Sequence, residues 1–247
     1  MKKIRISAVS YTNTKPFMYG LQHTGIFQKI ELSLDNPSDC AQKLIDDVVD
    51  IGLIPVAATL SLPYWEIVTD YCIGAVGAVN SVFIFSNCEI SAVRTLQLDP
   101  QSRSSNNLAR VLMKNFWKVD CKMQLNIPDY SKSQDPYTAF VQIGDRTFGK
   151  KNKYPFVYDL AEEWLKFTGL PFMFAAWIAN KQISGDFINE FNQSLKFGLD
   201  HRKELLKELP ERQDFDLDDY LMRKLDFGLT EDKQKAMLMF LDYIKGL

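Results

Sequence analysis

The sequence predicts an α/β protein of two lobes with a ligand cleft between them. Strand-like and helix-like segments alternate over residues 3–56, which favours a largely parallel sheet. A long β-rich stretch at residues 64–86 can cross from one lobe to the other, and an apolar strand at 170–179 is placed to return the chain. The 247 residues are enough for one large or two medium domains.

The first lobe is predicted to begin with a strand, a helix and a strand. "KIRISAV" and "IELSL" have the strand pattern, and the helix between them begins at Pro16 and ends near Gly25. A second helix has Asn36 as its N-cap and Pro37 in its first position. "DIGLIPV" at residues 50–56 follows as a short buried strand.

The second lobe is predicted to repeat this alternation before the chain returns. Its expected strands are residues 94–99, 121–127, 139–145 and 154–160, and its expected helices are residues 104–118 and 161–169. Residues 184–247 are expected to be nearly all helical. We therefore expect residues 1–86 and 175–247 to form the first lobe and residues 87–174 to form the second.

Composition and charge limit the class of partner. A net charge of −2 argues against a general nucleic-acid binder, which needs a basic excess to displace counterions from phosphates. The four cysteines are far apart and are expected to be reduced, and the two histidines lack metal-site spacing. No signal peptide or membrane-helix pattern is evident, so a cytoplasmic protein is expected. A small-molecule partner is predicted, without cofactor or metal.

Two predicted helix starts have the composition of an anion site. Five helices carry acids near their first turn, where a carboxylate complements the helix dipole, but the helices after "SYTNTK" and "DPQSRSSNN" do not. Backbone N–H groups, hydroxyls, amides and a cation remain there for a ligand. The candidate residues are Tyr11, Thr12, Asn13 and Lys15 at the first helix and Arg103, Ser104 and Ser105 at the second. The alternative is that Ser104 or Ser105 simply caps its helix.

Two further candidate groups lie after or within predicted strands. In "VQIGDRTFG", Gly144 permits a tight turn that places Asp145 and Arg146 at a strand end. Asp145 is a candidate general base, or else it caps the next helix and pairs with Arg146. Ser81 lies in the β-rich crossing stretch and matters only if that stretch lines the cleft.

Several sequence blocks together resemble the chorismate dehydratase family of the futalosine route to menaquinone. The blocks are "SYTNTKP" (10–16), "DIGLIPV" (50–56), "VNSVFIFS" (79–86), "LDPQSRSS" (98–105), "IGDRTF" (143–148) and "DLAEEWLKFTGLPFMFAAW" (159–177). The resemblance runs from about residue 4 to residue 178, and the C-terminal helices are similar only in character. It implies a fold like that of type II periplasmic binding proteins, with mixed sheets in two lobes.

The resemblance also implies a reaction and roles for residues. The family converts chorismate to 3-[(1-carboxyvinyl)oxy]benzoate by loss of water, and the enolpyruvyl carboxylate of the substrate is thought to remove the C3 proton. Asn13 and Ser81 would orient the substrate, and Ser104 and Ser105 would hold a carboxylate. "SRSS" departs from the more usual S-R-T-S by having Ser104 in place of Thr. The resemblance leaves Asp145 as either a base or a structural group.

Three alternatives to the dehydratase remain. One is a binding protein of the same fold that captures a small carboxylate unchanged, and another is the regulatory effector domain of a larger protein. The third is the related 1,4-dihydroxy-6-naphthoate synthase, which typically begins with a different strand-end motif containing Pro and Asp. "SYTNTKP" favours the dehydratase.

Overall fold

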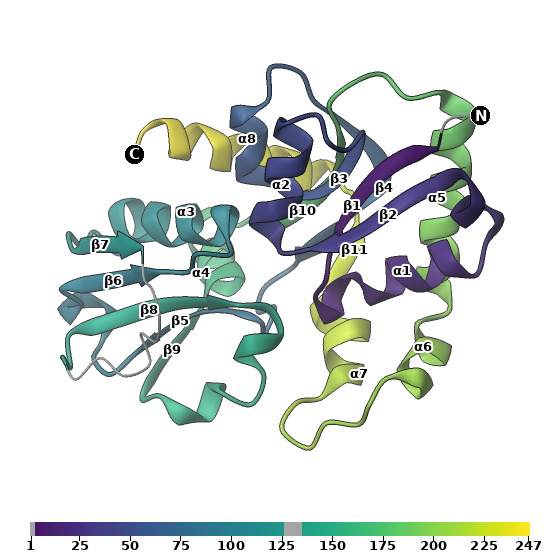
Figure 1. Cartoon of the computed structure of the whole chain (residues 1–247). Coiled ribbons are helices and arrows are strands. Elements are labelled where there is room, and N and C mark those ends of the chain that lie inside the picture. Colours follow the sequence, from purple (N-terminus) through teal and green to yellow (C-terminus); the bar gives the residue numbers. More distant parts are fainter. Residues whose placement is uncertain (1–2, 126–134) are drawn as a thin grey trace.

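The computed structural model describes residues 3–125 and 135–247 and has two α/β lobes joined side by side (Figure 1). In chain order the strands are β1 (Ile4–Val9), β2 (Ile30–Asp35), β3 (Ile51–Pro55), β4 (Glu66–Ala75), β5 (Val82–Ser86), β6 (Thr95–Leu98), β7 (Lys122–Leu125), β8 (Thr138–Ile143), β9 (Phe156–Asp159), β10 (Phe172–Ala179) and β11 (Asp226–Gly228). The α-helices are α1 (Lys15–Gln22), α2 (Pro37–Ile45), α3 (Arg103–Val111), α4 (Leu160–Thr168), α5 (Gly185–Asp200), α6 (Arg202–Glu208), α7 (Leu217–Asp219) and α8 (Glu231–Lys245).

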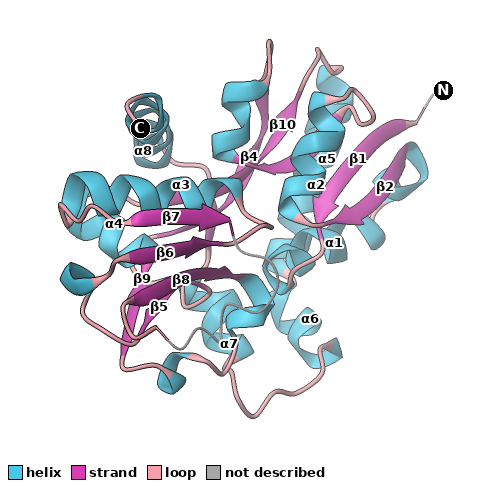
Figure 2. Cartoon of the chain, turned by 60° about the vertical axis from the view of Figure 1, so that its left-hand side comes forward, coloured by secondary structure: helices cyan, strands magenta, loops and turns pink. Residues whose placement is uncertain are grey.

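Each lobe is built around one mixed sheet, as Figure 2 shows. The larger lobe has six strands in the order β11-β4-β10-β3-β1-β2, and β10 runs antiparallel to both of its neighbours. The smaller lobe has five strands in the order β7-β6-β8-β5-β9, with parallel pairs on either side of β6. The predicted α/β class with mixed sheets is therefore confirmed.

The chain crosses between the lobes where the β-rich stretch predicted a crossing. Strand β4 ends at Ala75 in the larger sheet, and β5 begins at Val82 in the smaller one. Gly77 and Asn80, between them, both have positive φ, a conformation that Gly adopts freely and Asn tolerates. The chain returns through β10, as expected from its apolar sequence.

The strand pairing differs from the expected division in two places. Residues 82–86 were expected in the first lobe, but β5 pairs with β8 and β9 in the smaller sheet. The C-terminal region was expected to be helical, but β11 adds an edge strand beside β4. Its three residues are too few to show a period in the sequence. Residues 126 and 127, expected at the end of a strand, lie outside the described residues.

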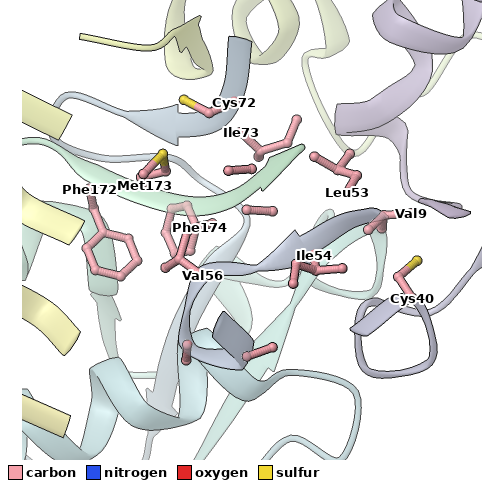
Figure 3. Close-up of a cluster of buried hydrophobic side chains, with 14 of the residues drawn as sticks. Val9, Cys40, Leu53, Ile54, Val56, Cys72, Ile73, Phe172, Met173 and Phe174 are labelled. Carbon is pink, nitrogen blue, oxygen red and sulfur yellow. The ribbon is translucent and has the colours of Figure 1, made fainter. Parts of the chain in front are cut away.

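The core of the larger lobe lies between its central strands and the helices that cover them. Figure 3 shows Leu53 and Ile54 of β3, Ile73 of β4 and Phe174 of β10 as members of one buried cluster, with Phe174 next to Val56. Strand β10 is buried along its whole length, which is why its sequence is a continuous apolar run. This packing fixes the strand ends that face the smaller lobe.

Helix α1 is held against α5 by two glycines that allow unusually close contact. A Cβ added to Gly20 would lie 1.9 Å from the carbonyl oxygen of Ser194, and one added to Gly198 would lie 1.8 Å from the carbonyl oxygen of Pro16. Side chains at these positions would force the helices apart. The close contact fixes the start of α1, and with it the segment that follows β1.

Candidate ligand-binding site between the lobes

A cavity lies where the larger lobe, the crossing segment and the smaller lobe meet. The polar residues that line it are Tyr11, Asn13, Thr14, Ser81, Ser102, Ser104 and Ser105, and its apolar walls include Val9, Ile73, Phe174 and Leu225. It also contacts Gly144, after β8. None of the cavity-lining residues in the described part of the chain is charged. The cavity is small, about 50 Å³.

Asn13 reaches the cavity from a short 3-10 helix, Thr12–Thr14, between β1 and α1. Pro16 stands at the start of α1, and no acid lies in the first turn, as the sequence predicted. The hydroxyl of Thr14 donates to Oδ1 of Asn13 at 3.1 Å. The carbonyl oxygen of the Asn13 amide is therefore engaged, and its NH₂ group remains as a donor to the cavity.

Ser81 lies at the end of the crossing segment and is buried. The hydroxyl of Tyr220 donates to Ser81 Oγ at 2.9 Å, and the backbone N–H of Gly144 donates to the Ser81 carbonyl at 2.8 Å. Within the described residues no acceptor contacts the Ser81 hydroxyl proton. Ser81 therefore keeps one O–H donor at the cavity wall.

The residue before Ser81 is fixed by a buried carboxyl group. Asp159 accepts the backbone N–H of Asn80 at 2.7 Å and also caps α4. Burial raises the pKa of Asp159 from its ordinary value of 3.8 to about 6, although the N–H groups that it accepts act to lower it. Asp159 therefore links the crossing segment to the smaller lobe.

The start of α3 supplies the third group of donors. Ser102 caps the helix by accepting the N–H of Ser105 at 3.1 Å, so the expected cap at Ser104 or Ser105 is wrong by two or three residues. Ser104 Oγ accepts the N–H of Ala57 in the larger lobe at 3.1 Å. Both oxygens are engaged as acceptors, and their protons remain. No acid lies in the first turn of α3, as predicted.

These polar groups share one property: the oxygen of each already accepts one hydrogen bond within the protein. Asn13, Ser81, Ser102 and Ser104 each accept a hydrogen bond from a neighbour and retain a proton to donate. Buried donors without a partner are costly, so a bound acceptor stabilises this arrangement. The cavity is suited to a ligand with an apolar body and carboxylate-like oxygens.

Asp145 does not line the cavity but joins the two lobes. Its carboxylate accepts the Thr12 backbone N–H at 3.1 and 3.2 Å and the Thr12 hydroxyl at 2.8 Å. The expectation that Asp145 caps the next helix or pairs with Arg146 is wrong, because Arg146 instead bonds Asp99 at 2.6 Å. Thr12 likewise contacts Asp145 rather than the cavity.

Tyr11 also connects the lobes and forms part of the cavity wall. Its hydroxyl donates to Gln101 Oε1 at 2.5 Å, and burial raises its pKa, so it stays a neutral phenol. Its ring packs on Gly144, where φ is +63° and an added Cβ would lie 2.7 Å from ring carbons. Gly144 is therefore required both for its backbone conformation and for the space it leaves.

The two expected cations do not reach the cavity. Lys15 lies in a separate depression beside α1 and α6, and Arg103 donates from α3 to Gln42 Oε1 in the larger lobe at 3.0 Å. The sequence identified both helix starts but not the direction of these side chains.

The structure adds residues that the sequence did not single out. Tyr220, which bonds the cavity residue Ser81, and Leu225, which lines the cavity, come from the C-terminal region, where the sequence indicates only helices. Phe174 was assigned only to a strand. Of these residues, only Ser102 has a local sequence signal. It is a serine just before a predicted helix, and its side chain can accept the N–H of the residue three positions later, Ser105. Tyr220 had no comparable signal.

Other classes of site find little support in the described residues. No group of three or more His, Cys, Asp or Glu side chains in residues 3–125 and 135–247 is arranged to hold a metal ion. No helix within these same ranges combines the length and apolar character needed to span a membrane. All four cysteines are free, as expected.

The chain is similar to a family model and to solved structures. The model, described as menaquinone biosynthesis, matches residues 4–246. A protein from Archaeoglobus fulgidus has a TM-score of 0.75 at 14% identity, with 99% of this chain and 97% of that chain covered. The alkanesulfonate-binding protein SsuA from Xanthomonas axonopodis pv. citri, bound to MOPS, has a TM-score of 0.65 at 12% identity, covering 100% and 93%.

A third similar structure names the fold. The Candida albicans protein described as having the generic periplasmic binding protein fold has a TM-score of 0.63 at 11% identity, covering 100% of this chain and 91% of that chain. At these identities the likeness concerns the fold alone. The predicted periplasmic-binding-protein-like fold is confirmed, and the family match extends beyond the N-terminal blocks to the C-terminal helices.

Proposed function

The chain belongs to the menaquinone-biosynthesis family, and on this premise we propose that it is a chorismate dehydratase. The proposed reaction converts chorismate to 3-[(1-carboxyvinyl)oxy]benzoate and water. The observation that carries the proposal is a set of neutral donor groups around a cavity without charged side chains in its described lining. The oxygens of Asn13, Ser81 and Ser104 each already accept a hydrogen bond from the protein. Such a site suits a dianion that brings its own base.

The proposed chemistry breaks one C–H and one C–O bond. The enolpyruvyl carboxylate of chorismate takes the C3 proton, and the electron pair of that bond spreads through the ring diene into the ring carboxylate. Donors at that carboxylate stabilise the developing charge more than the ground state. The C4 hydroxyl then leaves and takes up the proton held by the enolpyruvyl carboxyl group, which forms water, and the ring becomes aromatic.

The residues divide between the two carboxylates and the ring. We assign Asn13 and Ser81 to one carboxylate, because both line the cavity and each keeps a donor for a ligand. The start of α3, with Ser104 and Ser105, is assigned to the other, since helix N–H groups and serine hydroxyls favour an anion there. Phe174 and other apolar side chains would cover the ring.

Asp145 is proposed as a structural tie and not as the base. Both of its oxygens accept hydrogen bonds from Thr12, and it does not line the cavity. A general base must lie within hydrogen-bond reach of the proton that it removes. The free space of about 50 Å³ admits only a few waters, at roughly 10–15 Å³ each, so chorismate requires the walls to move. Parting of Asp145 and Thr12 would let chorismate enter, and the tie would form again once the substrate is bound.

The test is incubation of the purified protein with chorismate. Formation of the aromatic ether, followed by absorbance and mass, is the expected result, with a Ser81→Ala variant and a protein-free sample as controls. Chorismate that is bound but recovered unchanged would identify a carboxylate-binding protein. The absence of both binding and turnover would exclude chorismate as the ligand and direct attention to the related naphthoate synthase reaction.

A further inference from the structure

Tyr220 approaches the cavity from behind Ser81. It is 1% exposed, it begins the helical turn Tyr220–Lys224, and its hydroxyl lies 2.9 Å from Ser81 Oγ. We propose that Tyr220 is a positioning residue that holds the Ser81 hydroxyl with its proton directed into the cavity. The proposal rests on the proposed function only in assigning Ser81 a contact with the substrate.

The direction of the hydrogen bond follows from burial. Tyr220 is enclosed by protein, and this burial raises its pKa far above the ordinary value of 10.0, with the nearby carboxylates of Asp145 and Asp159 acting in the same sense. The phenol therefore keeps its proton, and among residues 3–125 and 135–247 the acceptor that it bonds is Ser81 Oγ. Once Ser81 accepts this bond, its own proton must point elsewhere.

The Ser81 backbone leaves little freedom for another arrangement. Its carbonyl accepts the N–H of Gly144 at 2.8 Å, and the preceding Asn80 is fixed through its N–H to Asp159 at 2.7 Å. Hydrogen bonds with the smaller lobe therefore hold the main chain at Ser81. The hydrogen bond from Tyr220, in the C-terminal region, holds the Ser81 side chain. The remaining direction for the Ser81 proton is toward the cavity that this residue lines.

The position of Tyr220 is set by aromatic contacts that involve both lobes. The Phe215 ring stacks on Phe148 of the smaller lobe with centroids 3.7 Å apart, and Tyr220 meets both rings edge-on at 5.2 and 5.4 Å. The next residue is fixed as well, because Arg202 donates to the Leu221 carbonyl at 2.8 Å. The C-terminal region thus contributes a packed support behind Ser81.

The experiment is a double-mutant cycle of Tyr220→Phe and Ser81→Ala, with Tyr158→Phe as the matched control. The Tyr158 hydroxyl accepts one hydrogen bond, from the Ile90 N–H at 2.8 Å, and Tyr158 does not line the cavity. Turnover of chorismate, KM and melting temperature are measured for each variant. Tyr220→Phe should lower kcat roughly 10-fold, the effect of losing about one hydrogen bond, while Tyr158→Phe leaves kcat unchanged.

The coupling between the two residues separates positioning from general support. Ser81→Ala should lower kcat roughly 100-fold, and Tyr220→Phe added to it should lower kcat no further. Equal effects of Tyr220→Phe in both backgrounds would overturn the proposal, as would unchanged kcat in the single variant.

A second readout applies to the ligand-free protein. With tyrosine labelled at the ring carbon that bears the hydroxyl, the Tyr220 NMR signal should shift in Ser81→Ala, and an unmoved signal would overturn the hydrogen bond. If the wild-type protein makes no product from chorismate, the proposed function fails. The Tyr220 signal still tests the hydrogen bond to Ser81 in that case, and an unmoved signal overturns the positioning proposal.

Discussion

The carboxylate of Asp145 in the smaller lobe holds both the backbone N–H and the hydroxyl of Thr12 in the larger lobe. This places the structural tie one residue away from Asn13, which contacts the cavity. Closure of the lobes and the position of Asn13 are therefore coupled through a single turn of chain. A ligand that enters between the lobes would act on both at once.

Replacement of Asp145 by Asn tests its role. Asn keeps a carbonyl oxygen for the Thr12 N–H, and its NH₂ group can donate to the Thr12 hydroxyl, so we expect kcat within about 10-fold of wild type. Loss of a general base would cost roughly 100- to 10,000-fold. Asp145→Ala should instead raise KM, because a charged hydrogen-bonded tie worth about 1–3 kcal/mol is lost. Steady-state kinetics distinguish the two roles, and a collapse of kcat in Asp145→Asn with intact ligand binding would establish the base.

Replacement of Asn13 by Ala should reduce turnover without unfolding the protein. The variant loses the donor that we assign to a substrate carboxylate, for which we expect roughly a 100-fold lower kcat. Asn192→Ala is the matched control, since Asn192 bonds Asp70 and does not line the cavity. Kinetics and thermal melting of both variants check the result. Normal turnover of chorismate by Asn13→Ala contradicts the assignment.

The two helix starts were predictable because their signal is local. Acids near the first turn are visible in the sequence, and the starts of α1 and α3 lack them both in sequence and in structure. Alternation of strand and helix likewise predicted the α/β class. These features depend on neighbouring residues, whose periodicity and capping can be interpreted without knowing the rest of the fold.

The contacts between distant segments were not predictable from a single sequence. Asp145 and Thr12 are 133 positions apart, and Tyr220 and Ser81 are 139 apart. No periodicity or motif indicates that such residues meet. The side-chain directions of Lys15 and Arg103 depend in the same way on how each helix sits against the rest of the molecule, so local composition placed them wrongly at the cavity.

Gly144→Ala should impair both stability and activity. Its φ of +63° costs an L-residue about 1–2 kcal/mol, and the new Cβ would also meet the Tyr11 ring at 2.7 Å. Gly169→Ala is the matched control, because φ is +75° there but nothing lies within 4 Å of an added Cβ. Both variants should melt earlier, and only Gly144→Ala should lose turnover. Equal turnover in the two variants would show that the Tyr11 contact has no bearing on the site.

Asp159 gives the protein a defined pH dependence of stability. Its ordinary pKa of 3.8 is raised to about 6 in the folded protein, chiefly by burial, so the folded state binds a proton that the unfolded state has released. This contribution to stability is complete below about pH 4, is lost as the pH rises to about 6, and changes no further above that. At about 1.4 kcal/mol per pKa unit, the loss is of the order of 3 kcal/mol.

Asp159→Asn removes this titration while keeping an oxygen to cap α4. We therefore expect the free energy of unfolding of the variant to fall less than that of wild type between about pH 4 and about pH 6. Urea titrations at several pH values in this range measure the free energy of unfolding of both proteins. Subtracting one curve from the other removes the contribution of groups that titrate alike in the two proteins. Because Asp159 fixes the N–H of Asn80 beside Ser81, the variant should also show weaker substrate binding at neutral pH. Parallel stability curves for the two proteins would mean that Asp159 has an ordinary pKa in the folded state.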